Sequence, residues 1–347
     1  MKKITLNKTS RANFLTYGGV TVAFIVLQFM ASGGMLSSTL KGQLVPICAY
    51  VVAALSLNLT VGILGELSLG HAGFMSVGAF VGAVTASALR GTIASDPLRM
   101  VIAMLLGAIF AGIAGFLIGI PVLRLNGDYL AIVTLAFGQI IKTLMENLYI
   151  GLDSRGLHWD FLTNDIVLAQ GGRMILNGPM GINIQKISTF AAGFILIMVA
   201  LMFIFNLVNS RSGRAIMALR DNRIAAESVG INVTKYKLMA FVLSAALAGA
   251  AGTLFALGQN TMVASKFDFN TSILILVFVV LGGQGRMWGS IIAAAALTVL
   301  PEMLREFSDY RMLVYAIVLI LVMLVTNNPT IQGYISRITG KKGGAKK

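Results

Sequence analysis

Two ionisable residues, Glu66 and His71, lie in a glycine-rich stretch of an otherwise apolar sequence, between Val61 and Gly82. A charged side chain at the centre of a membrane span costs about 2.5–3.5 kcal/mol on insertion scales, so it requires a partner or a water-lined site. Glu66 stands at the junction of two apolar runs, where a position among lipid headgroups also explains it. His71 fits a transport pathway, a proton carrier or a packing role, and the sequence favours packing.

A second interruption of the same kind runs from Val277 to Ser290. Glycine costs about 1 kcal/mol per helical position relative to alanine, so a cluster of glycines predicts a broken or bent helix. Backbone freed at membrane depth is tolerated only where protein buries it or where it lines a watery path. Broken segments in both halves of a transporter point to its pathway. We therefore expect pathway residues in the two interruptions, namely Glu66, Ser68, His71 and Gln284.

Some of these glycines also have a structural explanation, because small residues let membrane helices approach closely. We prefer that explanation for Gly78 and Gly82, which are spaced i, i+4. They are therefore predicted to lie at a tight contact between helices.

No set of residues in the sequence predicts catalysis. The chain has two histidines, His71 and His158, and lacks the GxSxG, HExxH and P-loop patterns. Its single cysteine, Cys48, can form neither a disulfide within the chain nor a CxxC metal site. We therefore predict no catalytic residue, no metal site and no bound cofactor, and a membrane-embedded enzyme is disfavoured. If ATP drives this protein, another chain must hydrolyse it.

A polar, basic segment at 209–237 separates two long apolar runs. Its core, Arg220–Ile231, predicts a short helix that Asp221 or Asn222 could cap and that Gly230 could end. Two interpretations are open on these residues alone. The helix could be a surface that a soluble partner contacts, or the segment could be an ordinary loop on lipid headgroups.

The predicted short helix carries side chains suited to a partner surface. Ile224 and Val229 could insert into a partner's groove, as the apolar side of a short amphipathic helix does. Arg223 and Glu227 are spaced i, i+4 and could form an ion pair.

The composition places the chain among polytopic membrane proteins. Of its 347 residues, 57% are hydrophobic and only 12% are charged, about half the charged share of soluble domains. The net charge of +14 would suit nucleic acid, but most lysines and arginines gather near the ends of apolar runs, at 2–11, 211–237 and 337–347. The preference of cytoplasmic loops for positive charge explains these clusters without nucleic acid.

Apolar stretches long enough to cross about 30 Å of hydrocarbon recur along the chain. The sequence therefore predicts an all-α polytopic membrane protein with about ten transmembrane helices, some of them broken or short. The predicted windows are 14–32, 43–64, 67–89, 98–120, 127–149, 188–208, 237–257, 271–282, 287–303 and 312–326.

Several separated motifs, in the same order, resemble the LivM-type permease subunit of branched-chain amino-acid ABC transporters. These motifs are LNLTVGILGELSLGHAGFMSVGAF, GDYLAIVTLAFGQI, LNGPMGI, LVFVVLGGQGRMWGSIIAAAAL and the segment from GRAIMALRDNRIAAESVGINV to LAGAAGTL. The resemblance runs from about Ala54 to Val325. It implies that 209–237 is a cytoplasmic coupling loop with a coupling helix.

The resemblance also implies which residues transmit the motion of an ATPase. Many ABC importers carry the coupling pattern EAAxxxG, and Ala225, Ala226 and Gly230 match its spacing. Ile224 stands where the pattern has Glu, and Glu227 follows the alanines, so a contact made by that first Glu does not carry over. The coupling residues implied are Arg220, Asp221, Arg223, Ala225, Ala226, Glu227 and Gly230.

The expected organisation follows from the charge clusters and the count of spans. Six crossings carry a cytoplasmic N-terminus back to the cytoplasm at Arg211, and four more bring the C-terminus there, so all three basic clusters share one side. The expected parts are a basic cytoplasmic N-terminus (1–13), a transmembrane permease domain (14–326) with an external connection at 150–187, and a basic cytoplasmic tail (327–347).

The family resemblance implies a bacterial inner-membrane assembly. Its parts are a second, LivH-like permease subunit, two ATP-binding cassette ATPase subunits that use ATP and Mg, an external substrate-binding protein and membrane lipid, with no nucleic acid. Leucine, isoleucine and valine are the implied cargo, and urea or short-chain amides stay open as alternatives. An ion-coupled secondary transporter or channel is the runner-up, which the short supply of central carboxylates disfavours.

Overall fold

A computed structural model of the chain describes residues 8–35, 37–125, 127–153, 156–161 and 172–304, with positions 166, 168, 313, 316, 317 and 320. The chain divides into two compact units, Met1–Ala295 and Ala296–Lys347. The residues that build the candidate site all belong to the first unit. The predicted tail at 327–347 lies outside the described residues.

Within the described residues, seven helices are long and apolar enough to cross a membrane. They are α1 (Lys8–Ser32), α2 (Ser38–Asn58) with its π-helical extension η1 (Leu59–Leu64), α3 (His71–Ala88), α4 (Asp96–Val122), α5 (Asp128–Glu146), α6 (Phe190–Asn209) and α9 (Val233–Leu257). Two shorter apolar helices follow, α10 (Phe269–Gly282) and α11 (Met287–Met303).

Nine of the ten predicted windows thus coincide with apolar helices, and the tenth, at 312–326, lies largely outside the described residues. The prediction of a helical polytopic membrane protein is confirmed. Its two short members, α10 and α11, are the pair that flank the second glycine-rich interruption.

Polar side chains fix where the apolar helices begin. Ser37 precedes α2, Thr189 precedes α6, Asn232 precedes α9 and Asp268 precedes α10, and each accepts a hydrogen bond from a backbone N–H of the first turn. A cap of this kind contributes typically about 1 kcal/mol.

Helix α9 is the centre of the packing in the first unit, since α2, α3 and α4 all pack on it. A side chain at Gly78 of α3 would collide with the backbone of Gly249 in α9, and one at Gly82 would collide with Thr253. Thr253 Oγ1 donates a hydrogen bond of 2.7 Å to the carbonyl of Gly78. The predicted packing role of Gly78 and Gly82 is therefore confirmed.

The long connection at 150–187 contains strands that the sequence did not predict. The sheet is antiparallel, in the order β2-β1-β3-β4-β5. Its strands are β1 (Leu148–Asp153), β2 (Gly156–Phe161), β3 (Arg173–Asn177), β4 (Ile182–Asn183) and β5 (Thr261–Met262). The strand β5 follows α9, so its pairing with β4 joins segments distant in the sequence. Strands β4 and β5, of two residues each, carry too few alternating residues for a period of two to be recognised.

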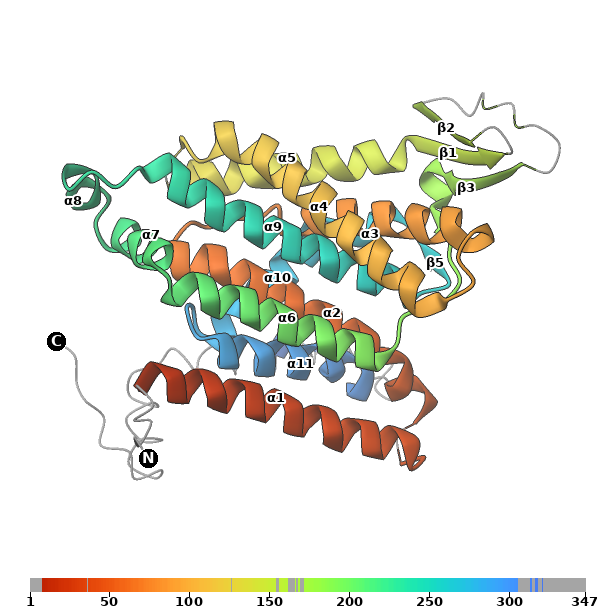
Figure 1. Cartoon of the computed structure of the whole chain (residues 1–347), viewed down its shortest axis with the longest axis horizontal. Helices are drawn as coiled ribbons and strands as arrows, with labels where there is room; N and C mark the ends of the chain where they lie inside the picture. Colours follow the sequence, from red (N-terminus) through yellow and green to blue (C-terminus); the bar gives the residue numbers. More distant parts are fainter. Residues whose placement is uncertain are drawn as a thin grey trace. The chain divides into compact units, whose positions relative to one another are not determined.

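Two regions outside the apolar helices lie at opposite ends of the first unit (Figure 1). The strands β1 to β5 are at one end, and the helices α7 (Arg211–Asp221) and α8 (Arg223–Ser228) are at the other. We call these the sheet end and the loop end.

Candidate functional site

The first glycine-rich interruption breaks the helical path between α2 and α3. The π-helix η1 ends at Gly65, whose φ of 80° lies in the left-handed region that favours glycine. Residues 65–70 have no helical structure, and α3 begins at His71. The break that the glycines predicted is confirmed, and it places Glu66 and Ser68 in irregular backbone.

The second interruption has the same character and lies against the first. Helix α10 ends at Gly282, α11 begins at Met287, and Gly283 and Gly285 between them have φ of 90° and 78°. A side chain at Gly62 would collide with the backbone of Gly285, so these two glycines allow the segments to touch.

One buried amide joins the two interruptions. Asn58, which has no exposed surface, accepts a hydrogen bond of 2.8 Å at Oδ1 from the backbone N–H of Gly285. Its Nδ2 donates to Ser290 Oγ over 2.9 Å. A buried amide with both ends paired specifies one arrangement, since loss of either partner would leave a polar group unsatisfied. The backbone around Gly62 and Gly285 is therefore held as one unit.

The polar loop between α6 and α9 forms two helices where the sequence predicted one. The short helix predicted within Arg220–Ile231 is α8. Asn222, with φ of −156° and ψ of 104°, is extended and separates it from α7, which the sequence did not predict. Arg220 and Asp221 therefore close α7. Of the two predicted caps, Asn222 is correct, and its Oδ1 accepts from Ala225 N over 3.0 Å.

The end of α8 agrees with the sequence prediction. Gly230 has φ of 84°, its N–H donates to the carbonyl of Glu227, and the N–H of Ile231 donates to the carbonyl of Ala226. This pair of bonds is the Schellman arrangement that satisfies the last carbonyls of a helix. Gly230 therefore ends α8 as predicted.

The two faces of α8 differ in exposure. Ala226 is buried in a small cluster with Leu219 and Val233. Ile224 and Val229 point away from the bundle with 80% and 75% of their surface exposed. The exposed apolar side of a short helix can lie in a groove on another protein. The pattern thus fits a small anchor on one side of α8 and a contact surface on the other.

The predicted i, i+4 pair on α8 is present. Arg223 Nε lies 3.5 Å from Glu227 Oε1, and both side chains are exposed. An exposed pair of this kind stabilises a helix by only about 0.3–0.5 kcal/mol. With Ala225 also exposed, the pair belongs to the same outward surface as Ile224.

Arg220 connects α7 to the first interruption. Its Nη1 donates a hydrogen bond of 2.9 Å to the carbonyl of Gly62, and its aliphatic stem lies against Gly65. The same guanidinium donates through Nε and Nη2 to Asp221 Oδ1, over 3.2 and 3.1 Å. The carboxylate of Asp221 therefore orients the group that holds the broken backbone.

A buried ion pair makes a second connection. Lys237, near the start of α9, pairs with Glu66, and their side chains are only 5% and 13% exposed. Glu66 thus has a charged partner from the far side of the loop. Together, Arg220 and Lys237 attach the loop on both sides of α8 to residues 59–70, the segment between α2 and α3.

The other predicted pathway residues divide between buried and exposed positions. His71 Nε2 lies 2.7 Å from Ser56 Oγ in a fully enclosed site. Ser68 is buried, and its hydroxyl has no hydrogen-bond partner among the described residues. Gln284 is exposed on the second interruption, next to the Gly285 that Asn58 holds. The four residues therefore lie on two segments in contact, and their role in a pathway stays a prediction.

The sequence analysis missed two residues that organise this region, Asn58 and Lys237. Asn58 is a lone amide in a long apolar run just before the glycines, and Lys237 is the last charge before another apolar run. Each is costly in lipid unless it has a partner, and that cost was the available signal. Among the residues that the structure describes, no group of three His, Cys, Asp or Glu side chains could hold a metal ion.

Comparison with known proteins places these features in a family. A family model described as "Branched-chain amino acid transport system / permease component" matches residues 39–323. The high-affinity branched-chain amino acid transport system permease protein LivM of Salmonella typhimurium is 35% identical over 298 residues, and its Escherichia coli counterpart is 36% identical over 286. Each match covers 79% of this chain and 66% of the relative, slightly less than two thirds of the relative's length.

More distant relatives carry other names. The ribose import permease protein RbsC of Haemophilus influenzae is 27% identical over 274 residues, a match that covers 76% of each chain. No solved structure matches the chain.

Proposed function

Since this chain belongs to the family of branched-chain amino acid transport permease components, we propose that it is the membrane-spanning subunit of an ATP-driven ABC importer. The observation that carries the proposal is the double attachment of the loop end. Arg220 and Lys237 hold the broken backbone of residues 59–70, while Ile224 and Val229 on α8 are left open to a partner.

The geometry supports a mechanical sequence. Two ATPase subunits, which bind ATP and Mg, cover the exposed face of α8 and shift it when they close. The shift reaches residues 59–70 through Arg220 and Lys237, and it reaches the second interruption through Asn58. The assembly then has two conformations, and nucleotide binding changes their relative populations. A ligand shifts such an equilibrium only if it binds one conformation more tightly than the other.

The orientation and partners belong to the same proposal. The loop end faces the cytoplasm and the sheet end faces the exterior, as the basic residues of 211–237 favour. Both termini are cytoplasmic in a bacterial inner membrane. A second permease completes the pathway, an external binding protein delivers cargo at the sheet end, and the ATPases bind at the loop end.

The proposed cargo is a branched-chain amino acid. Two relatives that are 35% and 36% identical over 79% of the chain are named for that cargo. The relatives named for ribose are 27% identical over 76% of the chain, or 33% identical over only 35% of it. Urea and short-chain amides remain alternatives. Competition for uptake of radiolabelled L-leucine by unlabelled leucine, isoleucine, valine, urea and acetamide separates these cargoes.

The function is tested by uptake of L-leucine into proteoliposomes that contain the assembled transporter. We expect Glu227→Arg combined with Gly230→Val to abolish uptake while the chain still enters the membrane, since the pair disrupts both the surface and the end of α8. Arg214→Gln, an exposed change on α7, is the control and should leave uptake intact. Leucine uptake that survives the double change, or gradient-driven uptake by the chain alone, would contradict the proposal.

A further inference from the structure

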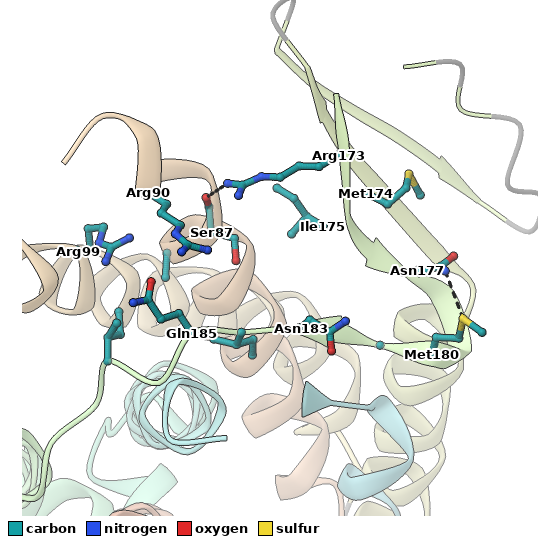
Figure 2. A pocket seen from close by; sticks show the side chains of 14 residues that line it. Ser87, Arg90, Arg99, Arg173, Met174, Ile175, Asn177, Met180, Asn183 and Gln185 are labelled. Carbon is teal, nitrogen blue, oxygen red and sulfur yellow. Dashed lines mark hydrogen bonds between the residues drawn. The ribbon is translucent and has the colours of Figure 1, made fainter. Parts of the chain in front are cut away.

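A pocket at the sheet end has no role in the coupling described above. It encloses about 240 Å³ beside the C-terminal end of α3 and the start of α4, against β3 and the segment that follows it. This volume is below the roughly 300–1,000 Å³ of sites for drug-sized ligands, so it suits a smaller molecule. The lining comes from segments far apart in sequence (Figure 2).

Three arginines from three different elements line this pocket. Arg90 comes from the turn after α3, Arg99 from the first turns of α4 and Arg173 from β3 (Figure 2). The lining contains no aspartate or glutamate. Asp96, which is outside the lining, pairs with Arg99. The pocket therefore has a net positive charge that favours an anion.

Not every N–H donor of these arginines has an acceptor among the described residues. Arg173 Nη2 donates to the carbonyl of Ser87 over 2.7 Å. Arg99 is only 5% exposed, and its Nε has no hydrogen-bond partner among the described residues. A buried charged donor without an acceptor is costly, and an anionic oxygen in the pocket would satisfy it. Within the same described residues, no carboxylate pairs with Arg90 or Arg173.

The rest of the lining is mainly apolar, with three amide side chains among it. Aliphatic groups come from Ala86, Ile175, Ile184 and Ile187, and amide groups come from Asn177, Asn183 and Gln185. Amide oxygens can accept hydrogen bonds from an ammonium group, and guanidinium groups can bind a carboxylate through two parallel bonds. A zwitterion with a short aliphatic side chain matches all three kinds of surface.

We infer that this pocket binds the transported aliphatic amino acid on the outer side, with its carboxylate held by Arg90, Arg99 and Arg173. The inference rests on the proposed function for the identity of the cargo. The arginines supply the charge, the aliphatic residues accept the side chain, and the site gives free amino acid a position on the permease before it moves inward.

The test measures binding of radiolabelled L-leucine to the assembled transporter in nanodiscs, without the external binding protein. Arg90→Gln combined with Arg173→Gln removes two exposed charges from the pocket and leaves Arg99 and its pair with Asp96 intact. Lys186→Gln combined with Lys266→Gln removes two exposed charges from the same end outside the pocket lining. We expect the arginine variant to weaken leucine binding by about tenfold or more, because charge-assisted hydrogen bonds are lost, and the lysine variant to bind normally.

Competing ligands separate the carboxylate from the rest of the molecule. Isovalerate keeps the carboxylate and the aliphatic chain and should compete with leucine on the unaltered transporter, whereas leucinamide lacks the carboxylate and should compete poorly. Equal leucine binding by the arginine variant and the unaltered protein would overturn the inference that the pocket binds leucine. Leucine uptake by the unaltered transporter would still support the proposed function.

Two further outcomes are distinct. If the arginine variant binds leucine normally but the external binding protein no longer stimulates ATP hydrolysis, the arginines contact a protein and the inference is overturned. If the unaltered transporter takes up no branched-chain amino acid, yet isovalerate binding still depends on Arg90 and Arg173, the proposed function fails and the carboxylate site stands.

Discussion

The loop end and the sheet end treat their basic residues in opposite ways. At the loop end, Arg220 and Lys237 reach into the bundle and find partners there, a backbone carbonyl and the carboxylate of Glu66. At the sheet end, Arg90 and Arg173 line a pocket that has no acidic lining. Arg173 also donates to the carbonyl of Ser87. Neither Arg90 nor Arg173 pairs with a carboxylate of the described residues, so the sheet end keeps the capacity to bind an anion.

The two ends also differ in shape. The loop end presents α8 as a projection, with Ile224 and Val229 exposed on it. The sheet end presents a pocket of about 240 Å³. A projection with aliphatic groups suits a groove on another protein, whereas a small polar pocket suits a small molecule. Basic residues alone therefore do not indicate what an end of this molecule binds.

The largest effect on stability is expected from breaking the buried pair at the loop end. Lys237→Ala leaves the carboxylate of Glu66 buried without a partner, and we expect a loss of about 3–5 kcal/mol. Thermal unfolding of the detergent-solubilised protein measures it. Glu66→Gln with Lys237→Met should recover most of the stability but not leucine uptake. Equal stability of Lys237→Ala and the unaltered protein would show that the Lys237–Glu66 pair does not stabilise the loop end.

A smaller loss is expected from crowding the contact between the interruptions. The new methyl group of Gly62→Ala would collide with Asn58 and with the backbone of Gly285. Overpacking of this kind costs about 1–3 kcal/mol. Gly91→Ala near the sheet end is the matched control, because nothing lies within 4 Å of the added atom. The comparison fails if unfolding temperatures of the two variants fall equally.

Removing the N-cap of α8 tests the local stability of this helix separately from the rest of the protein. Asn222→Ala removes the acceptor for Ala225 N and should cost about 1 kcal/mol, mostly as fraying of α8. Amide hydrogen exchange of residues 223–228 should rise, while Asn222→Asp keeps the acceptor and should preserve protection. Unaltered exchange in Asn222→Ala would mean that tertiary contacts alone hold α8.

The smallest change in stability is expected at the exposed tip. Ile224→Ser with Val229→Ser should alter the unfolding free energy by no more than about 0.5 kcal/mol, because both side chains are exposed. We expect the same variant to lose co-purification with the ATPase subunits and to keep leucine binding at the sheet end. Normal co-purification would show that α8 is not the contact surface.

The sequence was sufficient for features whose cause is local. Runs of apolar residues predicted nine helices, glycine clusters predicted both interruptions, and Asn222 and Gly230 predicted the start and end of α8. These features depend on residues close together in the sequence. The length of an apolar run, a capping side chain and a glycine with left-handed backbone can each be recognised there.

Features that depend on distant segments could not be predicted. Asn58 holds Gly285, Lys237 pairs with Glu66, and Arg173 joins Arg90 beside one pocket. One sequence shows the cost of each lone polar group but not its partner. The strands at the sheet end were missed for a related reason, since β4 and β5 are two residues long and gain their form only by pairing.

Helix α9 has a consequence for communication between the ends. It is continuous from Val233 to Leu257, a length of about 37 Å at 1.5 Å per residue. Lys237 lies near its first turn, and its last carbonyl, of Leu257, accepts the backbone N–H of Ile187, a residue of the pocket lining. A tilt of this rod that moves Lys237 also moves the pocket floor. If the pocket holds a ligand and nucleotide binding by partner subunits displaces Lys237, as proposed, thermodynamic reciprocity requires each ligand to change the other's affinity by the same factor.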